Sequence, residues 1–367
     1  MGVSRFMSAL LQATAELAPQ HDYLLYFRKE TLQQPPFITA PFVPRVLSGS
    51  PILMSPLVWQ QVYFPWQAWR DRVDVLFSPY YCGPLLTWTP QVICICDISF
   101  SLFPRDFPSW LHFKPKLFAR PSSQRARKVM TISEFSRQEL LRVYGLSPEK
   151  VVVIHAGTEQ QYWRRKSNLA RQARLQIDFP FFLFVGSLLP RRQVEAVLQA
   201  LAQLPAQYQL VVVGETDTER LTKLITAAQR WNVAERLVCL GHVSDDALEQ
   251  LYTDTVALVS PSTYEGFGLP ILEALQRGVP VIAWDIPVVR EVAGDAAMLL
   301  PVGDIKGLTA KMERIASDSD ARETFCQAGK ERAQQFSWRH SAITFLGMLH
   351  EVVERKKKDV NYSPTLR

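Results

Sequence analysis

Glycines and glutamates lie close together in the segment VALVSPSTYEGFGLPILEALQRGVPVIAW, residues 256–284. The apolar run at its start, Pro270 and Gly278 predict a strand, a loop, a helix and a second strand. Gly266 and Gly268 let the backbone approach a ligand closely, and the helix after them directs N–H groups and a positive dipole end at the same place. We therefore expect a diphosphate to bind there.

Two carboxylates flank this glycine turn. Glu265 lies on the loop, and Glu273 lies about one turn into the helix. A carboxylate accepts paired hydrogen bonds from adjacent sugar hydroxyls and repels phosphate, so both glutamates should contact hydroxyl groups. The pattern predicts a ligand that lies across the helix start, with a hydroxyl-bearing group at each end.

The rest of the chain predicts the elements that must position these residues. A chain of 367 residues exceeds what one hydrophobic core usually organises, so two domains are expected. Short apolar runs alternate with helical stretches, which is the pattern of an α/β fold with parallel sheets covered by helices. The predicted strands are 23–27, 74–79, 92–96, 128–133 and 151–157 in the first half, and 181–187, 209–215, 236–242, 256–262 and 280–284 in the second. Glycine or serine follows several strands of the second half, at the carboxyl edge where doubly wound folds bind ligands.

The composition is that of an ordinary folded protein, with 47% hydrophobic and 21% charged residues. No apolar run approaches the roughly 18 residues of a membrane span, and Gln12 and Thr14 interrupt the opening segment where a signal peptide needs an apolar block. Five cysteines without a C-x-x-C pair indicate neither a disulfide framework nor a zinc site. We expect a cytoplasmic protein that needs no metal and no other cofactor.

The charge is unevenly distributed along the chain. Residues 1–200 carry 23 Lys and Arg against 13 Asp and Glu, whereas residues 201–367 carry 18 against 22. Much of the basic excess lies among aromatic residues in 101–128, which suits an anionic membrane surface or nucleic acid. A solvated basic helix face whose aromatic side chains enter the core is the competing interpretation. The residues expected to dock on a membrane are Lys114, Lys116, Arg120, Arg125, Arg127 and Lys128.

The segment EGFGLPILE, residues 265–273, resembles the signature of family 4 glycosyltransferases, in which seven residues separate two glutamates. The following RGVPVIA, the earlier FFLFVGSLLPRRQVEAVLQAL and ISEFSR resemble the family as well, so the resemblance covers nearly the whole chain. It implies a retaining enzyme of the GT-B fold, in which two Rossmann-like domains with parallel sheets face a cleft. It also implies an acceptor-binding domain over 1–165, a nucleotide-sugar-binding domain over 166–336, and, over 337–367, a final helix that returns to the amino-terminal domain and ends in a basic tail.

The resemblance assigns roles to single residues. Glu273 would bind the ribose hydroxyls of the donor nucleotide, and Glu265 would contact the donor sugar. Arg191 and Arg192 would hold the leaving diphosphate. Arginine here replaces the family's usual lysine, so a planar guanidinium that can donate two parallel hydrogen bonds takes the place of a compact ammonium. Ser187 stands where many members have arginine. The expected donor-binding residues are Glu273, Gly266, Phe267, Gly268, Leu269, Gly186 and Ser187.

The segment VICICDISFSLFP resembles a VHDLSF segment of the family. Asp97 is retained, and Cys96 replaces the family histidine near the donor sugar. A thiol is only a weak hydrogen-bond donor, so a reduced rate or an altered donor would follow. The competing interpretation of Cys96 is a small buried residue at a strand end. With Glu265, Arg191 and Arg192, these two residues complete the expected catalytic set.

The implied activity is transfer of a sugar from a nucleotide-sugar to a glycan or lipid-linked acceptor, by front-face displacement with retention. The segments CDISF and SEFSR look most like mannosyltransferases of surface-polysaccharide assembly, which favours GDP-mannose and a peripheral place on the inner face of a membrane. Three alternatives stay open: a sugar-nucleotide epimerase, a binding module without turnover, and a nucleic-acid-binding protein. The last lacks a recognisable module and leaves the glutamates unexplained, so no nucleic-acid partner is expected.

The chain opens with a predicted helix where doubly wound domains normally begin with a central strand. Val3, Phe6, Met7 and Leu10 recur at helical spacing. We therefore expect that the first strand of the amino-terminal sheet is missing and that an in-frame coding stretch lies upstream of Met1. A segment around FITAPFV, residues 37–43, filling the gap is one alternative, and a decaying gene is the other.

Overall fold

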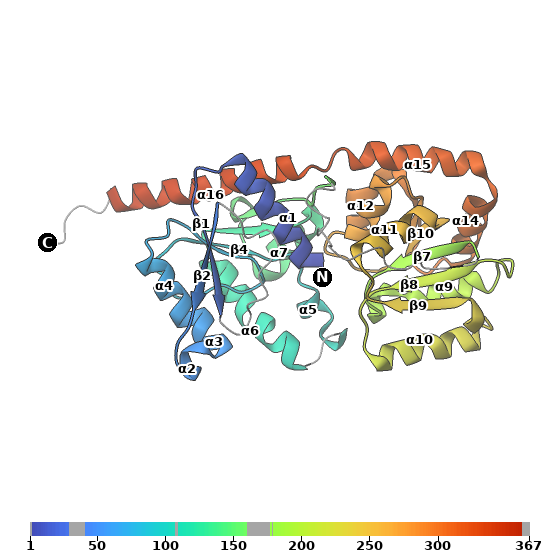
Figure 1. Ribbon diagram of the computed structural model, residues 1–367, viewed down its shortest axis with the longest axis horizontal. Coiled ribbons are helices and arrows are strands. Elements are labelled where there is room, and N and C mark those ends of the chain that lie inside the picture. Colours follow the sequence, from blue (N-terminus) through green and yellow to red (C-terminus); the bar gives the residue numbers. More distant parts are fainter. Residues whose placement is uncertain (1, 29–40, 107–108, 160–176, 178, 362–367) are drawn as a thin grey trace. The chain divides into compact units, whose positions relative to one another are not determined.

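The computed structural model describes residues 2–28, 41–106, 109–159, 177 and 179–361, with side chains described except at 109–116 and 357–361 (Figure 1). The chain forms two compact units. Unit 1 comprises Met1–Trp163 together with Ser337–Arg367, and unit 2 comprises Arg164–Phe336. The domain boundary predicted between residues 165 and 166 lies outside the described residues.

Unit 2 is built on one parallel sheet of six strands in the order β12-β11-β10-β7-β8-β9. Its strands are β7 (Phe181–Val185), β8 (Gln209–Val213), β9 (Leu237–Gly241), β10 (Ala257–Ser260), β11 (Val281–Trp284) and β12 (Met298–Leu300). The five strands predicted in this half are confirmed, and β12 is an additional strand. Because helices cover both faces of such a sheet, its central strands are continuous apolar runs, as β7, β10 and β11 are.

Helices connect and cover the strands of unit 2. They are α9 (Val194–Leu201), α10 (Thr218–Arg230), α11 (Asp245–Asp254), α12 (Leu269–Gln276), α13 (Pro287–Ala293), α14 (Ile305–Ser317) and α15 (Ser319–Ala333), with short 3₁₀ turns η5 (Pro190–Arg192), η6 (Ala234–Arg236) and η7 (Gly294–Ala296). Side-chain caps fix several starts: Asp217, Ser244, Asp304 and Asp318 each accept a backbone N–H of the first turn. The helix predicted after the glycine turn is α12, with Pro270 in its first turn as expected.

The described strands of unit 1 form two parallel sheets. One has the order β3-β4-β5-β6, and the other pairs β1 with β2. The strands are β1 (Tyr23–Arg28), β2 (Phe42–Leu47), β3 (Leu76–Ser78), β4 (Gln91–Cys94), β5 (Lys128–Thr131) and β6 (Val151–Val153). The strands predicted in this half are confirmed, and β2, which contains Pro44, was not predicted. In the described ranges no strand joins β1 to β3. The last two residues of the FITAPFV segment open β2, and residues 37–40 lie outside the described ones.

The helices of unit 1 include a cluster of short pieces. They are α1 (Gly2–Leu17), α2 (Pro51–Met54), α3 (Pro56–Val58), the π-helical η2 (Trp59–Tyr63), α4 (Phe64–Arg70), α5 (Ser99–Leu102), η3 (Pro104–Asp106), α6 (Ser109–Arg125), α7 (Glu134–Tyr144), η4 (Pro148–Lys150) and α16 (Trp338–Asn361). The helix predicted at the start of the chain is α1, and Phe6, Met7 and Leu10 are buried on it. Over the part of the chain that the structure describes, no helix combines the length and apolar character needed to cross a bilayer.

The last helix, α16, belongs to unit 1 and is held at its start by contacts with the segment after β6. The Glu159 carboxylate accepts the Ser337 hydroxyl and the Trp338 backbone N–H, each at 2.7 Å. Trp338 is fully buried, and its ring lies 5.4 Å from that of Phe6 on α1. A side chain at Gly157 would lie 2.1 Å from the Trp338 nitrogen. Segments from both ends of the sequence therefore complete one core.

Candidate active site

The carboxyl edge of the unit 2 sheet is shaped by glycines that follow β7 and β8. The Gly186 N–H donates to the Val213 carbonyl at 2.8 Å, so the two strand ends are bonded beyond the strands themselves. A Cβ at Gly214 would lie 2.2 Å from the Gly186 oxygen, and both glycines have φ near +150°, at +155° and +148°. Only glycine fits this close approach. Gly186 and Gly214 therefore follow their strands at the carboxyl edge, as the sequence predicted.

The basic pair expected to hold a diphosphate lies in η5, directly before α9. The loop after β10 is bonded to this turn, because Thr263 donates both its backbone N–H and its hydroxyl to the Arg191 carbonyl, at 2.8 and 3.1 Å. Behind the turn, the buried Trp284 indole donates to the Gln193 side chain at 2.9 Å. Both arginines therefore lie on a backbone fixed by neighbouring strands.

Arg192 and Glu265 form an ion pair. The same guanidinium lies 3.4 Å from the Ser262 hydroxyl. The sequence named the two residues separately, one for the diphosphate and one for the sugar, and the structure brings them into direct contact. A guanidinium carries five N–H donors, so it can bind a carboxylate and an anionic ligand at the same time. The contact places an anchored positive group beside the loop that leads into α12.

Glu273 is 7% exposed and lies on the first turns of α12. The Tyr252 hydroxyl on α11 donates to its Oε2 at 2.9 Å. Arg277, at the C-cap of α12, donates to the Glu273 carbonyl at 2.7 Å, and its guanidinium lies 5.0 Å from the centre of the Tyr252 ring. Arg277 is in turn held by Glu249 at 2.6 Å. The Glu273 carboxylate is thus held by Tyr252, which the sequence interpretation did not name.

The start of α12 has the geometry that the glycine turn predicted. Gly268 occupies the N-cap with φ +96°, which a residue with a side chain rarely adopts, and the helix begins at Leu269. The Phe267 ring is buried, and it packs edge-on against Phe336 with ring centres 5.9 Å apart. Of Gly266, Phe267 and Gly268, the middle residue can therefore offer a ligand only its backbone amide.

In unit 1, Cys96 and Asp97 follow β4 at the carboxyl edge of its sheet. The Cys96 sulfur is buried and lies 3.6 Å from that of Cys94, whose pKa is raised by burial and then by this contact. This geometry favours the interpretation of Cys96 as a small packing residue. Asp97 accepts the Ser99 N–H at 2.7 Å. Burial, and then the charge of Asp97, raise the pKa of Tyr81, so its hydroxyl remains a donor.

The basic residues expected to dock on a membrane differ in their surroundings. Arg120, Arg125 and Arg127 are exposed, whereas the side chains of Lys114 and Lys116 lie outside the described ones. The prediction for Lys128 is wrong. This residue opens β5 and is buried, and its ammonium binds the Glu149 carbonyl and the Glu351 carboxylate, each at 2.8 Å. A buried charge needs such partners, which keep Lys128 inside the unit.

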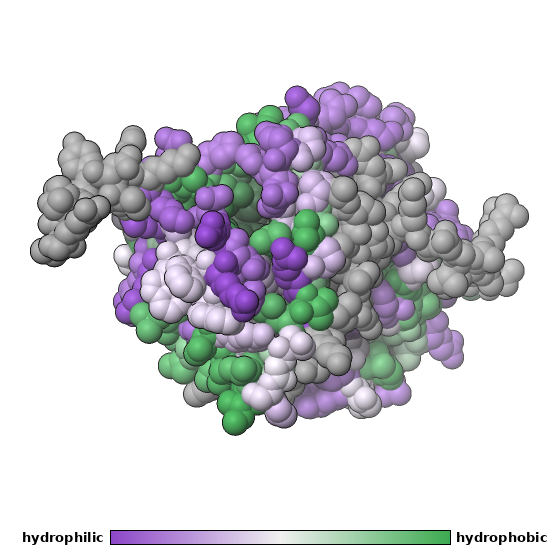
Figure 2. Space-filling model, turned by 60° about the vertical axis from the view of Figure 1, so that its left-hand side comes forward, coloured by the Kyte–Doolittle hydropathy of each residue, from purple (hydrophilic) through white to green (hydrophobic). Residues whose placement is uncertain are grey.

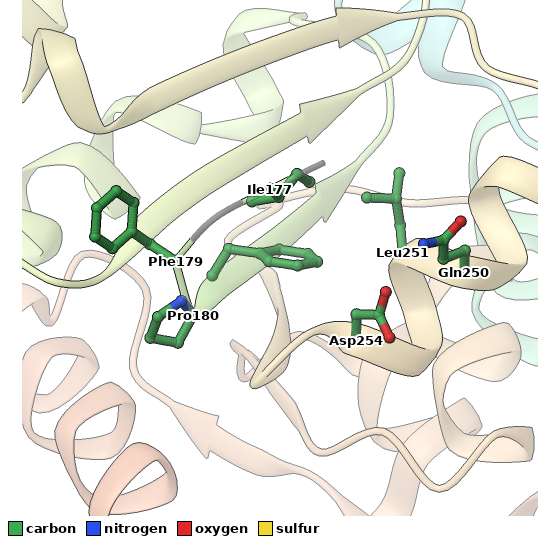
Figure 3. Close-up of a pocket in the computed structure, with 7 residues that line it drawn as sticks. Ile177, Phe179, Pro180, Gln250, Leu251 and Asp254 are labelled. Carbon is green, nitrogen blue, oxygen red and sulfur yellow. The ribbon is translucent and has the colours of Figure 1, made fainter. Parts of the chain in front are cut away.

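A cavity of about 270 Å³ in unit 2 lies at the opposite edge of the sheet, where β7 begins (Figure 3). Phe179 and Pro180 line it from the strand entrance, and Gln250, Leu251 and Asp254 line it from α11. Because Gly186 and the start of α12 lie at the carboxyl edge, this cavity is separate from the predicted site.

Two family models match the chain over nearly its full length. Residues 2–162 match the model described as glycosyltransferase family 4, and residues 166–332 match the one described as glycosyl transferases group 1. An O-antigen chain mannosyltransferase B of Escherichia coli is 31% identical over 290 residues, which cover 74% of each chain. The chain belongs to the glycosyltransferase family that these two models describe. It is an enzyme of that family, as the sequence predicted.

Further relatives of this glycosyltransferase agree with the assignment. The O-antigen chain mannosyltransferase RfbU of Salmonella typhimurium is 27% identical over 77% of this chain and 78% of its own. A solved Anabaena protein, HepE in complex with UDP and glucose, matches with a TM-score of 0.70 at 18% identity, over 94% of this chain and 95% of that one. At that identity the likeness shows the fold alone, which is GT-B. The predicted fold class is confirmed.

Proposed function

We propose that this glycosyltransferase transfers mannose from GDP-mannose to a glycan or lipid-linked acceptor, with retention of configuration. The observation that carries the proposal is the contact of Arg192 with Glu265 beside the start of α12, where Glu273 is held by Tyr252. A positive group, a helix start and two oriented carboxylates are what a diphosphate between two hydroxyl-bearing groups requires. Mannose as the sugar is supported by the names of the Escherichia coli and Salmonella relatives.

In the proposed reaction, the bond between the anomeric carbon of the donor sugar and the diphosphate oxygen breaks. The same carbon bonds to an acceptor hydroxyl oxygen on the same face, and the acceptor proton passes to the departing phosphate oxygen. The products are a glycoside with the donor's configuration and GDP. Arg191, Arg192 and the start of α12 stabilise the charge that grows on the diphosphate, and one such contact typically contributes about 100-fold or more in rate.

The test is transfer from a panel of labelled GDP- and UDP-sugars to lipid-linked acceptors in a membrane extract, followed by NMR of the new linkage. We expect transfer from GDP-mannose and an α-linked product. The Arg192→Ala variant should lose about 100-fold or more in rate, whereas Arg314→Ala, on α14 of the same unit, should retain the parent's rate. Transfer from UDP-sugars alone would overturn the donor assignment, and a β-linked product would overturn retention.

Ser187 and the buried Cys96 favour a second candidate, a protein that binds a nucleotide-sugar without turning it over. Ser187 stands in place of an arginine and Cys96 in place of a histidine, and the family resemblance associates both of the replaced side chains with the donor. This candidate predicts GDP binding in calorimetry with neither sugar transfer nor donor consumption in the same extract. An epimerase would instead consume the donor without an acceptor.

A further inference from the structure

Large hydrophobic side chains are exposed on one part of unit 1. They come from the helices α2 to α4, drawn in blue at the lower left of Figure 1, and from the loop between β3 and β4. Figure 2, which brings this side of the molecule forward, shows hydrophobic side chains gathered along its lower edge. The aromatic face is defined by residues whose exposed fractions are Ile52 75%, Leu57 47%, Val62 57%, Trp66 39%, Trp69 54%, Leu86 71% and Trp88 70%.

The aromatic face is held together by polar contacts beneath it. Gln60 donates to the Cys82 carbonyl at 2.8 Å, and Gln61 both donates to the Gly83 carbonyl at 3.2 Å and accepts the Leu85 N–H at 2.8 Å. These bonds fix the loop that carries Leu86 and Trp88 against the π-helical η2. Across the surface, the Trp69 and Trp88 rings lie 5.8 Å apart. The exposed side chains therefore stand on one ordered support.

Basic side chains border the aromatic face. A hollow of about 410 Å³ is lined by the loop from Leu85 to Gln91 and by Arg125, Arg127 and Lys356. Arg70 lies over the Trp66 ring at 5.6 Å. The segments 44–70, 79–92 and 107–128 contain no Asp or Glu, whereas Asp71 follows Arg70 and the helix α16, which carries Lys356, also carries Glu351 and Glu354. Basic side chains thus lie beside the exposed apolar ones, and the segments that carry the apolar side chains have no acidic residue.

This face lies at the amino edge of the unit 1 sheet. Gln91 opens β4, and Arg127 directly precedes β5. Cys96 and Asp97 follow β4 at the carboxyl edge, where doubly wound folds bind their ligands. The aromatic face is therefore separate from the edge at which a substrate is expected. Substrate binding and catalysis thus do not explain why its tryptophans are exposed.

We propose that the aromatic face docks on the surface of a bilayer containing anionic phospholipids. Tryptophan is enriched where proteins meet the membrane interface, since its ring is apolar and its N–H is polar. The basic border then binds lipid phosphates, and Arg125 and Lys356 lie around a hollow next to Trp88. This differs from the docking expected from the sequence, which relied on residues 101–128 alone, and it does not depend on the identity of the donor sugar.

Vesicle flotation with the full-length protein tests the proposal. Vesicles of phosphatidylcholine alone are compared with vesicles that also contain phosphatidylglycerol, and the first variant combines Trp66→Ser, Trp69→Ser and Trp88→Ser. A second combines Arg70→Gln, Arg125→Gln and Lys356→Gln. Matched controls on unit 2 are Ile225→Ser, at an exposed apolar residue, and Lys306→Gln, at an exposed basic one. Circular dichroism and thermal melting check that each variant is folded.

We expect the parent and both controls to float with the anionic vesicles and to bind the neutral ones much more weakly. Each basic residue near such a surface contributes about fivefold in partition, equivalent to about 1 kcal/mol, so the triple charge variant should bind about 100-fold more weakly. The tryptophan variant should lose binding to both kinds of vesicle. Quenching of tryptophan fluorescence by spin-labelled lipid gives an independent readout.

Three results would overturn the proposal. One is binding that ignores anionic lipid and salt. Another is folded variants that float as the parent does. The third is a dimer in lipid-free solution that the tryptophan variant abolishes, which would assign the face to a second copy of the chain. Since the glycosyl transfer test uses product formation and this one uses lipid partition, each proposal can fail without the other.

Discussion

The two glutamates of the glycine turn are held by different neighbours. Glu265 contacts Arg192, which follows β7, and Glu273 accepts the Tyr252 hydroxyl from α11. The motif revealed the glutamates because it is local in sequence. Tyr252 lies 21 residues before Glu273 and on another helix, so no spacing rule connects the two residues. Arg277 lies one helical turn after Glu273, which is a spacing that the sequence does reveal.

The Glu273→Ala variant is expected to weaken GDP binding by about 100-fold or more, because a charged acceptor of two hydroxyl groups is lost. Glu265→Gln should change GDP affinity little, since glutamine still offers Arg192 an acceptor, but should lower turnover by about 100-fold. Calorimetry with GDP and initial rates measure the two effects. Equal loss of affinity in both variants would refute this division of roles.

Tyr252→Phe removes the hydroxyl that orients Glu273 and leaves the ring beneath Arg277. We expect GDP to bind about tenfold more weakly, because a hydrogen bond to a charged group is lost. Tyr208→Phe is a matched control, since its ring packs against Phe182 in the same unit. If both variants bind GDP as the parent does, Tyr252 does not position Glu273 for the donor.

At the scale of elements, the 3₁₀ turn η5 and the start of α12 meet at one edge of the sheet through the bonds of Thr263 and Glu265. The strands of unit 2 were predictable because buried parallel strands are continuous apolar runs, and glycine follows or ends β7, β8 and β9. The basic pair lies in η5, just before α9. The short helices between 51 and 70 were not predicted, since their exposed apolar residues give no clear period.

The proposed site supplies positive charge to the diphosphate from Arg191, Arg192 and a helix start. We therefore expect that sugar transfer continues in excess EDTA at a rate within about twofold of the untreated enzyme, because these elements take the electrostatic role that a metal ion has in other transferases. Initial rates with and without chelator give the answer. Loss of activity that Mg²⁺ or Mn²⁺ restores would contradict the expectation.

At the scale of the whole molecule, unit 1 is discontinuous in sequence and unit 2 is continuous. The buried side chains Trp338 and Phe345 on α16 complete the core of unit 1, where Phe345 meets Phe77 of β3 with ring centres 4.9 Å apart. The resemblance predicted the return of this helix. The exposure of Trp66, Trp69 and Trp88 was not predictable, because it depends on which faces the neighbouring elements leave uncovered.

Gly157→Ala should destabilise unit 1, because the added methyl group would overlap the Trp338 backbone and displace the start of α16. We expect a loss of about 1–3 kcal/mol in the free energy of unfolding. Gly347→Ala is the matched control, since Gly347 lies on α16 with open space around it, and alanine should stabilise a helix there by up to about 1 kcal/mol. Denaturant unfolding measures both, and equal stability of the two variants would show that the close contact is unimportant.

The discontinuity of unit 1 also governs the order in which the protein forms during synthesis. The residues of unit 2 leave the ribosome as one uninterrupted stretch, so this second part of the sequence can fold before α16 joins unit 1. The first part of the sequence cannot complete unit 1 until α16 is available, and the positions that Trp338 and Phe345 fill stay open to water until then. The core of unit 1 can therefore close only after the last helix has been released, although its first residues are made before all others.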